Sequence, residues 1–396
     1  MNNIRVSIDL GNGYLKALMV GTEDDRDIVL AQTIQKTPGY RKGKILDSDK
    51  LAQTIHQIVE WFQSKIGGGY IDDVIVGISH PEMKISRISE HRRILGNNVV
   101  TANDASQLSK LVKDISQHNN YEIIKIIPSY WILDDKTIEK KPVGSEANKL
   151  TLIADIFYLP RVFYQQLYTL FHSINLNVID VVPNILSASE YLLDLDDRDL
   201  GSLLIDIGAN QTSYVVIEDG NVLSYGALPV GGDDVTKDLS IGLQINIKQA
   251  EQLKTTYSQL EDDEDNMRLD HKFLHEIISA RYEQIFSKIN DQLKHINRDG
   301  KLAGGVHLTG CGTLRAESIS YARDIFQLAV FPAQIGKKYH DFADKIEFHN
   351  TLALYERGKK YHDKGKGFFS RWFGFSGWWS GKGIRSNIVE FFKELF

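Results

Sequence analysis

The sequence predicts an α/β protein in two related halves, with a small α+β module inserted into the first half and an amphipathic helix at the C-terminal end. Two apolar segments, residues 4–13 and 203–212, each read as a buried strand that ends in Asp-x-Gly and a small polar turn. Strand and helix patterns alternate through most of the chain, which is typical of three-layer α/β proteins. Apolar side chains at helical spacing in residues 386–396 indicate the terminal helix.

The composition limits the classes of protein to consider. The chain has 396 residues, 42% apolar and 25% charged, which is ordinary for a globular protein of two to four domains. Its net charge of −6 argues against nucleic acid as a partner, because duplex binders carry a basic surface. The single cysteine, Cys311, excludes an internal disulfide and a cysteine-rich zinc site. We expect no secretory leader and no membrane-spanning segment, and hence a cytosolic protein.

The expected elements form an α/β pattern on both sides of the inserted module. The first α/β piece has a helix at 48–65, which ends at three glycines, and a strand at 73–78. The module then has strands at 84–88, 122–127, 130–133 and 150–156 and a helix at 104–116. The α/β pattern resumes with helices at 160–172 and 184–193 and a strand at 178–182, and the second half opens at Gly201.

The second half carries a mostly helical stretch at 235–296 before the pattern returns to a strand at 306–308. The helical stretch contains the acidic run 261–265, which we interpret as a solvated loop.

The two Asp-x-Gly segments suit a metal-bound phosphate. Their residues are Asp9, Gly11, Asn12, Gly13 and Lys16 in the first, and Asp206, Gly208, Ala209, Asn210, Gln211 and Thr212 in the second. A carboxylate at the end of a strand, followed by glycines, lets backbone N–H groups approach an anion. Either segment alone is equally well an ordinary turn. Two copies with matched flanking strands favour two halves that clamp one nucleotide.

Three further features lie along the second half. Gly231 and Gly232 form a turn, and Gly310, Cys311 and Gly312 form another after an apolar strand. Between them, an expected helix at 246–258 places Glu251, Lys254 and Ser258 on one face. That face could bind a ribose and a purine edge, although on its own it is better explained as a surface ion pair.

In this order, the turns and the Glu/Lys helix resemble the actin-like ATPase superfamily over residues 1–357. Within it, the segments 229–243, 127–134 and 142–144 resemble the FtsA family of bacterial cell-division proteins. The resemblance implies an actin-like fold, a duplicated ribonuclease H-like fold of two domains. The implied parts are subdomain 1A at 1–80, 158–196 and 336–357, the inserted subdomain 1C at 81–157, subdomain 2A at 197–235 and 301–335, subdomain 2B at 236–300, a linker with an aromatic basic segment at 358–385, and a membrane-targeting helix at 386–396.

The resemblance also implies roles for the site residues. Asp9 and Asp206 would hold Mg²⁺ through water, the two phosphate turns and Lys16 would bind the phosphates of ATP, and the Gly231-Gly232 turn would border the site. The purine and ribose would lie against Glu251, Lys254, Ser258, Gly310, Cys311 and Gly312.

The chain departs from the family pattern where catalysis would be decided. The second turn has Ala209, Asn210 and Gln211 where glycines are usual. The strand-to-helix junction, where many superfamily members carry a water-orienting Gln or Glu, runs from Asp180 to Asn184. Positioning of the attacking water is a large part of phosphoryl transfer. We therefore expect slow or absent hydrolysis, and name Asp180 and Asn184 as the catalytic candidates should turnover be brisk.

The C-terminal tail is basic and aromatic, with a net charge of +5 from residue 359 onward. Trp side chains and Lys/Arg suit an anionic membrane surface, and an eleven-residue helix needs something to bury its apolar face. The alternative is a helix that docks on this protein or in a partner groove. The expected membrane contacts are Phe368, Phe369, Trp372, Phe373, Trp378, Trp379, Ile388, Phe391, Phe392, Leu395 and Phe396.

The resemblance implies an ATP-binding protein that polymerises head to tail on the cytoplasmic side of the membrane, as a peripheral protein at the division site. Its implied partners are the C-terminal tail of FtsZ, other copies of itself, membrane lipid, and downstream division proteins at the inserted subdomain. Two alternatives stay open: a pilus-assembly adaptor similar to PilM, which the second turn also resembles, and a small-molecule kinase of the same fold.

Overall fold

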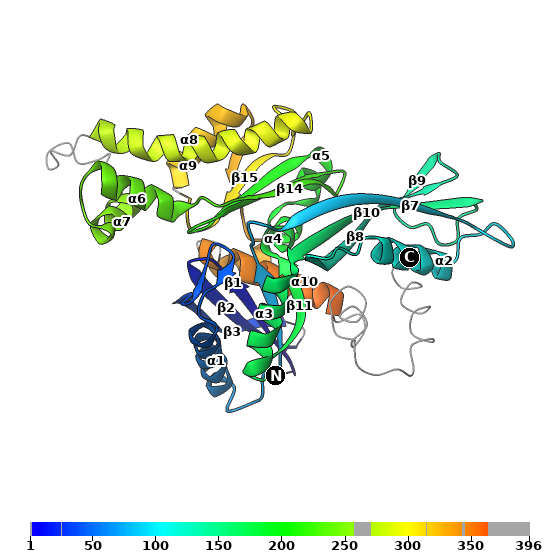
Figure 1. The fold of residues 1–396 in the computed structure, drawn as a ribbon, viewed down its shortest axis with the longest axis horizontal. Helices are drawn as coiled ribbons and strands as arrows, with labels where there is room; N and C mark the ends of the chain where they lie inside the picture. The colour runs from blue at the N-terminus through cyan, green and yellow to red at the C-terminus, as the bar shows by residue number, and fades with distance from the viewer. Residues whose placement is uncertain (1, 25, 257–270, 314, 343–344, 363–396) are drawn as a thin grey trace. The chain divides into compact units, whose positions relative to one another are not determined.

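The computed structural model describes residues 2–24, 26–256, 271–313, 315–342 and 345–362, which form two compact units. Among these described residues, the first unit comprises 2–71, 76–81 and 183–355, and the second comprises 72–75, 82–182 and 356–362. Figure 1 labels the helices and strands. The division falls within β6 (Asp73–Ile78), β11 (Asn177–Pro183) and α10 (His349–His362).

The first half of the first unit is built on an antiparallel meander. Its strands are β1 (Asn2–Leu10), β2 (Tyr14–Glu23) and β3 (Arg26–Lys36), followed by the short pair β4 (Tyr40–Arg41) and β5 (Lys44–Ile45). Helix α1 (Ser48–Lys65) begins where the Asp47 carboxylate accepts a 3.0 Å hydrogen bond from the Lys50 N–H. Leu51, Ile55 and Phe62 lie on its buried face.

The second half of the first unit repeats this meander. Strands β12 (Ser202–Ile207), β13 (Thr212–Glu218) and β14 (Asn221–Leu228) are antiparallel, and β15 (Gly305–Thr309) and β16 (Val330–Pro332) extend the sheet with parallel pairing. Every residue of β12 is buried, because β13 and β15 flank it. Asp206 pairs with Ser213 as Asp9 pairs with Lys16, so the two carboxylates hold matching places in the two meanders.

Helices pack on the second meander and form its core. They are α4 (Asn184–Leu192), α5 (Leu195–Leu200), α6 (Gly232–Gly242), α7 (Ile247–Thr256), α8 (His271–His295) and α9 (Arg315–Phe326), and the 3₁₀ turns η2 (Lys337–Phe342) and η3 (Ile346–Phe348) lead to α10. Helix α8 lies beside α9 and contacts α6 (Figure 1). Its Tyr282, Phe286 and Ile289 are buried in one cluster with Leu203 and Ile205 of β12.

The second unit has its own sheet and core. Its strand order is β7 (Lys84–Arg93), β10 (Lys149–Pro160), β8 (Tyr121–Leu133) and β9 (Thr137–Glu139), accompanied by α2 (Ala102–Ile115) and α3 (Arg161–Ser173). Trp131, Leu150 and Leu108 lie in its buried cluster. Helix α2 begins at a capping box in which Thr101 and Asp104 bond each other's backbone N–H.

Most of the predicted elements are present, and one pair was wrong. The helix expected at 48–65 and the strand expected at 73–78 are α1 and β6. The two strands expected at 122–127 and 130–133 are one strand, β8. Its register against β10 shifts between Pro128 and Tyr130, so a bulge at Ser129 carries the strand past a proline that cannot donate a ladder hydrogen bond.

Several sequence predictions lie outside the described residues. These are the acidic run 261–265, Ser258 and every predicted membrane contact from Phe368 to Phe396. Among the helices that the structure describes, none has the length and apolar character to cross a bilayer.

Candidate functional site

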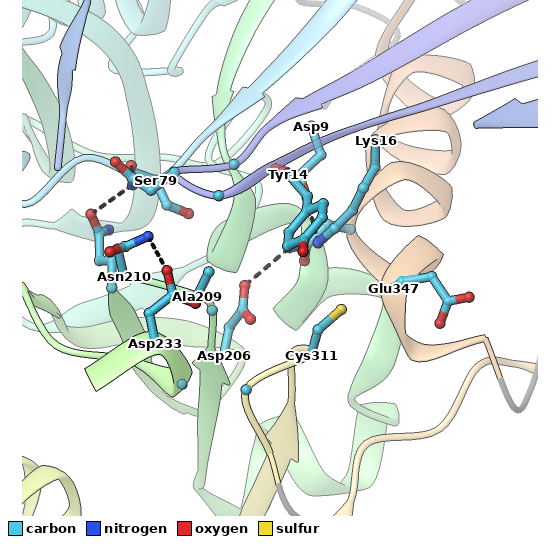
Figure 2. A pocket seen from close by; sticks show the side chains of 18 of the residues that line it. Asp9, Tyr14, Lys16, Ser79, Asp206, Ala209, Asn210, Asp233, Cys311 and Glu347 are labelled. Carbon is cyan, nitrogen blue, oxygen red and sulfur yellow. Dashed lines mark hydrogen bonds and ion pairs between the residues drawn. The ribbon is translucent and has the colours of Figure 1, made fainter. Parts of the chain in front are cut away.

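The first unit contains a pocket of about 360 Å³ where its two meanders meet (Figure 2). Both predicted phosphate turns contribute to it. The lining residues are Asp9, Gly11, Asn12, Gly13, Tyr14, Lys16, Ile34, Ser79, Asn184, Asp206, Gly208, Ala209, Asn210, Gln211, Ser213, Gly232, Asp233, Glu251, Lys254, Cys311, Gly312, Glu347 and Asn350.

Asp9 is held in the pocket from two sides. Its side chain is buried at the end of β1. Lys16 donates to Oδ2 over 3.3 Å, and the amide of Asn184, the first residue of α4, donates to Oδ1 over 2.6 Å. Burial disfavours the charged form of Lys16 and by itself would lower its pKa. The electrostatic attraction of Asp9, Cys311 and Asp206 is larger in sum, so the pKa of the Lys16 ammonium is raised. Lys16 therefore stays a cation in the pocket.

Asp206 is the matching carboxylate of the second meander. It is buried at the end of β12, and the amide of Asn350 donates to its Oδ2 over 3.0 Å. Burial raises the pKa of Asp206, Asp9 adds to this, and the hydrogen bond from Asn350 and the charge of Lys16 oppose it. A second positive charge near Asp206 would stabilise its ionised form.

The glycines of the turns allow backbone segments to touch. A Cβ on Gly13 would lie 2.6 Å from Cβ of Ala209, so the first turn packs on the second. A Cβ on Gly312 would lie 2.7 Å from the carbonyl oxygen of Gly208, and one on Gly232 would lie 3.0 Å from Cα of Gly312. Tyr282 of α8 donates to the carbonyl of Gly312 over 2.5 Å and holds this third turn in place. Side chains at these three glycine positions would clash with the neighbouring turns.

Asn12 joins the two phosphate turns. Its Nδ2 donates over 3.3 Å both to the Ser79 carbonyl and to Oε1 of Gln211, and its Oδ1 accepts from the Gly43 N–H over 2.8 Å. Gln211 in turn donates to Ser213 over 3.3 Å. Gln211 of the second turn thus binds the first turn.

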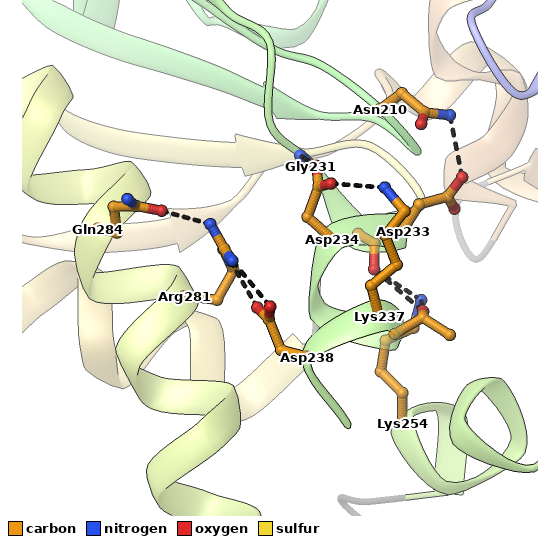
Figure 3. A network of polar contacts seen from close by, with 11 residues as sticks. Asn210, Gly231, Asp233, Asp234, Lys237, Asp238, Lys254, Arg281 and Gln284 are labelled. Carbon is orange, nitrogen blue, oxygen red and sulfur yellow. Dashed lines mark hydrogen bonds and ion pairs between the residues drawn. The ribbon is translucent and has the colours of Figure 1, made fainter. Parts of the chain in front are cut away.

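The pocket is also lined by Gly232 and Asp233 at the beginning of α6 and by Glu251 and Lys254 in the middle and last turn of α7. Figure 3 shows polar contacts of Asp233 and Lys254. Lys254 donates to the Gly232 carbonyl, to Thr236 Oγ1 and to Glu251 Oε2, over 3.1, 2.8 and 2.8 Å. Asn210 donates to Asp233 over 2.9 Å (Figures 2 and 3). Burial raises the pKa of the Asp233 carboxyl. The Glu/Lys face predicted on α7 therefore lines the pocket.

The structure places the remaining predicted residues as follows. Thr212, Gly231 and Gly310 support the turns without lining the pocket: Thr212 Oγ1 donates to the Val230 carbonyl over 2.9 Å, and Gly310 has a φ of +95° that favours glycine. Asp180 belongs to the second unit, where the Lys125 ammonium donates to its Oδ2 over 2.6 Å. Asn184 lines the pocket, and Asp180 does not.

Sequence reasoning missed seven lining residues, namely Tyr14, Ile34, Ser79, Ser213, Asp233, Glu347 and Asn350. Tyr14 and Ser213 stand next to predicted turn residues, and Tyr14 is an exposed position beside the buried Leu15, a signal that was available. Asp233 follows the Gly231-Gly232 turn. Ile34, Glu347 and Asn350 come from distant segments and carry no local motif.

The carboxylates that line the pocket are the groups that could hold a metal there. No group of three or more His, Cys, Asp or Glu side chains suited to a metal occurs among the described residues. Mg²⁺ commonly uses only one or two carboxylates together with water and substrate phosphates. Asp9 and Asp206, in one pocket beside a glycine cradle, fit that arrangement.

Two family models match the chain. The model described as "Cell division protein FtsA" matches residues 203–352, and the model described as "SHS2 domain inserted in FTSA" matches residues 83–157. The first match contains the second phosphate turn, and the second match lies in the second unit.

Relatives with the same description cover most of the chain. The "Cell division protein FtsA" of Enterococcus hirae is 26% identical over 362 residues, which are 86% of this chain and 81% of that protein. The protein so described from Bacillus subtilis is 24% identical over 344 residues, 82% of this chain and 77% of that protein.

Solved structures share the fold. A chain of a "PilM-PilN type IV pilus biogenesis complex" has a TM-score of 0.65 at 15% identity and covers 89% of this chain and 98% of that chain. MreB5 of Spiroplasma citri bound to ADP has a TM-score of 0.56 at 13% identity and covers 92% of this chain and 99% of that chain. At these identities the likeness concerns the fold alone, and the predicted actin-like α/β fold with an inserted subdomain is confirmed.

Proposed function

This chain belongs to the FtsA family of bacterial cell-division proteins, and on that premise we propose that it is an ATP-dependent division scaffold. It binds ATP with Mg²⁺ in the pocket of the first unit, hydrolyses it slowly or not at all, and polymerises head to tail on the cytoplasmic side of the membrane. There it tethers FtsZ filaments at the division site.

The observation that carries nucleotide binding is the pair of strand-end carboxylates in one glycine-lined pocket. Asp9 and Asp206 end matching strands, and the backbone turns that follow them pack on each other at Gly13 and Ala209. Backbone N–H groups and a metal suit a polyphosphate at such a place. The ADP-bound MreB5 of Spiroplasma citri, which shares the fold, supports this assignment by analogy.

The charges of the pocket support binding of the nucleotide as its Mg²⁺ complex. Five carboxylates line it, namely Asp9, Asp206, Asp233, Glu251 and Glu347, against the two ammonium groups Lys16 and Lys254, counted over the described lining residues. A bare triphosphate would meet net negative charge. Mg²⁺ held by Asp9 and Asp206 through water would reduce this repulsion and neutralise phosphate oxygens.

Slow hydrolysis is supported by the position of Asn184. This residue occupies the strand-to-helix junction, and its amide is committed to Asp9 over 2.6 Å and to Ser79 Oγ over 3.4 Å. With the amide nitrogen used in this way, Oδ1 is the atom left to orient an attacking water, and that oxygen is buried. The other catalytic candidate, Asp180, is paired with Lys125.

Exposed apolar side chains on the second half are the proposed contacts for the FtsZ tail. They are Ile241, Ile247 and Phe273, at the ends of α6, α7 and α8, which are 76%, 54% and 41% exposed. The inserted subdomain is the proposed contact for downstream division proteins. Membrane attachment rests on the sequence of the tail, which lies outside the described residues.

The decisive experiment is electron microscopy of the purified full chain on anionic lipid monolayers, with and without Mg·ATP. Filaments that require Mg·ATP, and that an Asp206→Asn variant fails to form, support the proposal. Monolayers without filaments in either condition contradict it. A pilus-assembly adaptor similar to PilM and a small-molecule kinase remain the alternatives. Turnover with a panel of small acceptors would identify the kinase.

A further inference from the structure

Thr37, the residue that follows β3, holds the first phosphate turn from behind. Its N–H donates to the Gly13 carbonyl over 3.1 Å, and its Oγ1 donates to the Gly11 carbonyl over 2.9 Å. Thr37 is buried and is not among the residues that line the pocket, whereas both glycines are. One residue therefore binds two carbonyls of the turn on the side away from the pocket.

These two hydrogen bonds fix the direction in which the peptide groups of the turn point. The described residues contain no cis peptide bond, and in a trans peptide the C=O and the N–H point in opposite directions. Thr37 binds the carbonyls of Gly11 and Gly13. The N–H groups on the same two peptide units belong to Asn12 and Tyr14, which line the pocket, and they point away from Thr37. Backbone N–H groups presented to a concave site in this way bind anions.

The second half has an equivalent arrangement that is built from different groups. The Gly232 N–H donates to the Gly208 carbonyl over 2.9 Å, and the Asp233 N–H donates to the Ala209 carbonyl over 2.7 Å. Gly232 and Asp233 begin α6, and the first N–H groups of a helix have no partner inside the helix. Each phosphate turn is thus held through its carbonyls by the segment that follows the third strand of its meander.

The first half needs a side chain for this role because of Pro38. In the second half two successive N–H groups donate, but the residue after Thr37 is a proline, which has no N–H. The Thr37 hydroxyl supplies the second donor instead. A serine hydroxyl could take its place, whereas a valine of the same shape has no donor.

We propose that Thr37 is a positioning residue for phosphate binding, whose hydroxyl orients the first phosphate turn so that its backbone N–H groups face the ligand. This inference rests on the proposed nucleotide binding and names a residue outside the pocket on which the affinity depends. Thr37 acts through Gly11 and Gly13 and does not touch the nucleotide.

The test is calorimetric titration of the full chain with Mg·ATP and, separately, with Mg·tripolyphosphate, which has the phosphates without the nucleoside. Thr37→Val removes the hydroxyl and should weaken the binding of both ligands about tenfold, in keeping with the loss of one hydrogen bond. Thr37→Ser keeps the hydroxyl and should keep both affinities. Thr22→Val is the matched control and should change neither affinity, because it removes a 3.3 Å hydrogen bond to Asp27 at the other end of β2.

Four results would overturn the role of Thr37. The first is an unchanged affinity in Thr37→Val, and the second is an equal loss in Thr37→Ser. The third is a loss for ATP alone, since the turn holds phosphate. The fourth is a lower stoichiometry with an unchanged dissociation constant, which would mean that Thr37 only stabilises the fold. If the unmodified chain binds neither ligand, the proposed nucleotide binding itself is wrong, and the role of Thr37 is wrong with it.

Discussion

The side-chain amide of Asn184 donates a 2.6 Å hydrogen bond to Oδ1 of Asp9. The second half has a counterpart, since Asn350 donates to Oδ2 of Asp206 over 3.0 Å. Each of the two strand-end carboxylates is thus fixed by an asparagine at the beginning of a helix, Asn184 in α4 and Asn350 in α10. The duplication seen in the strands extends to the groups that orient their carboxylates.

Removing the amide from Asn184 should destabilise the first unit. Asn184→Ala removes the 2.6 Å hydrogen bond to Oδ1 of the buried Asp9 carboxylate and leaves the longer one from Lys16 to Oδ2, and we expect the free energy of unfolding to fall by about 2 kcal/mol. Asn177→Ala is the matched control, because Asn177 makes a similar 2.7 Å bond to Asp73 at an exposed position. It should cost under about 0.5 kcal/mol. Urea unfolding measures both, and equal losses would contradict the role of Asn184.

Turnover of ATP should be slow although binding is retained. With Asn184 committed to Asp9, we expect phosphate release below about 1 s⁻¹ at saturating Mg·ATP. A continuous phosphate assay measures the rate, and an Asp206→Asn preparation gives the background from contaminating ATPases. A rate well above that value which Asp206→Asn abolishes would show that the pocket orients water by another route.

The stability contribution of Asp206 should depend on pH in a definite direction. Burial raises the pKa of this carboxyl in the folded protein, so its contribution is full below the unfolded value of 3.8 and is lost as the pH rises through the folded pKa. Without nucleotide, Asp206→Asn should therefore gain thermal stability over the unmodified chain progressively as the pH rises above the unfolded pKa of 3.8 and through the raised folded pKa. Added Mg²⁺ should stabilise the unmodified chain and not the variant. A pH-independent difference between the two melting temperatures would refute this.

The third glycine turn should not accept a side chain at Gly312. A Cβ there would lie 2.7 Å from the Gly208 carbonyl oxygen and 2.8 Å from that of Ile207, both backbone atoms that cannot move aside cheaply. We expect Gly312→Ala to cost about 1–3 kcal/mol of stability and to weaken Mg·ATP binding at least about tenfold. Gly336→Ala, whose nearest atom would be 3.9 Å away, should leave both unfolding and calorimetric titration unchanged.

The tail should carry the membrane contact. Phe391→Glu together with Phe392→Glu places two charges on the predicted apolar face and should release the full chain from anionic liposomes. Glu394→Gln, on the opposite face, is the control and should leave co-sedimentation unchanged. Nucleotide affinity should be the same in all three proteins. Undiminished co-sedimentation of the double variant would refute the membrane assignment.

What the sequence alone determined is local and periodic. The strands that end at Asp9 and Asp206 were readable from apolar runs followed by glycine turns, and α1 from its helical spacing. Both turns, the Glu/Lys helix and the Gly310–312 turn could be placed because each is a contiguous pattern whose backbone geometry depends on its own residues. The bulge at Ser129 could not be predicted from the sequence, because a bulge is defined by the register against the partner strand β10.

Only the tertiary structure decided how these patterns act together. Asn350 and Ile34 reach the pocket from segments far from the turns. Asp180, which the sequence alone left as a catalytic candidate beside Asn184, instead accepts a hydrogen bond from Lys125. Tyr14 reads as an ordinary strand residue until the register of β2 and β3 places it beside Ile34 on the pocket face. Which side chains contact one another depends on how distant segments pack, and no local pattern in the sequence shows that packing.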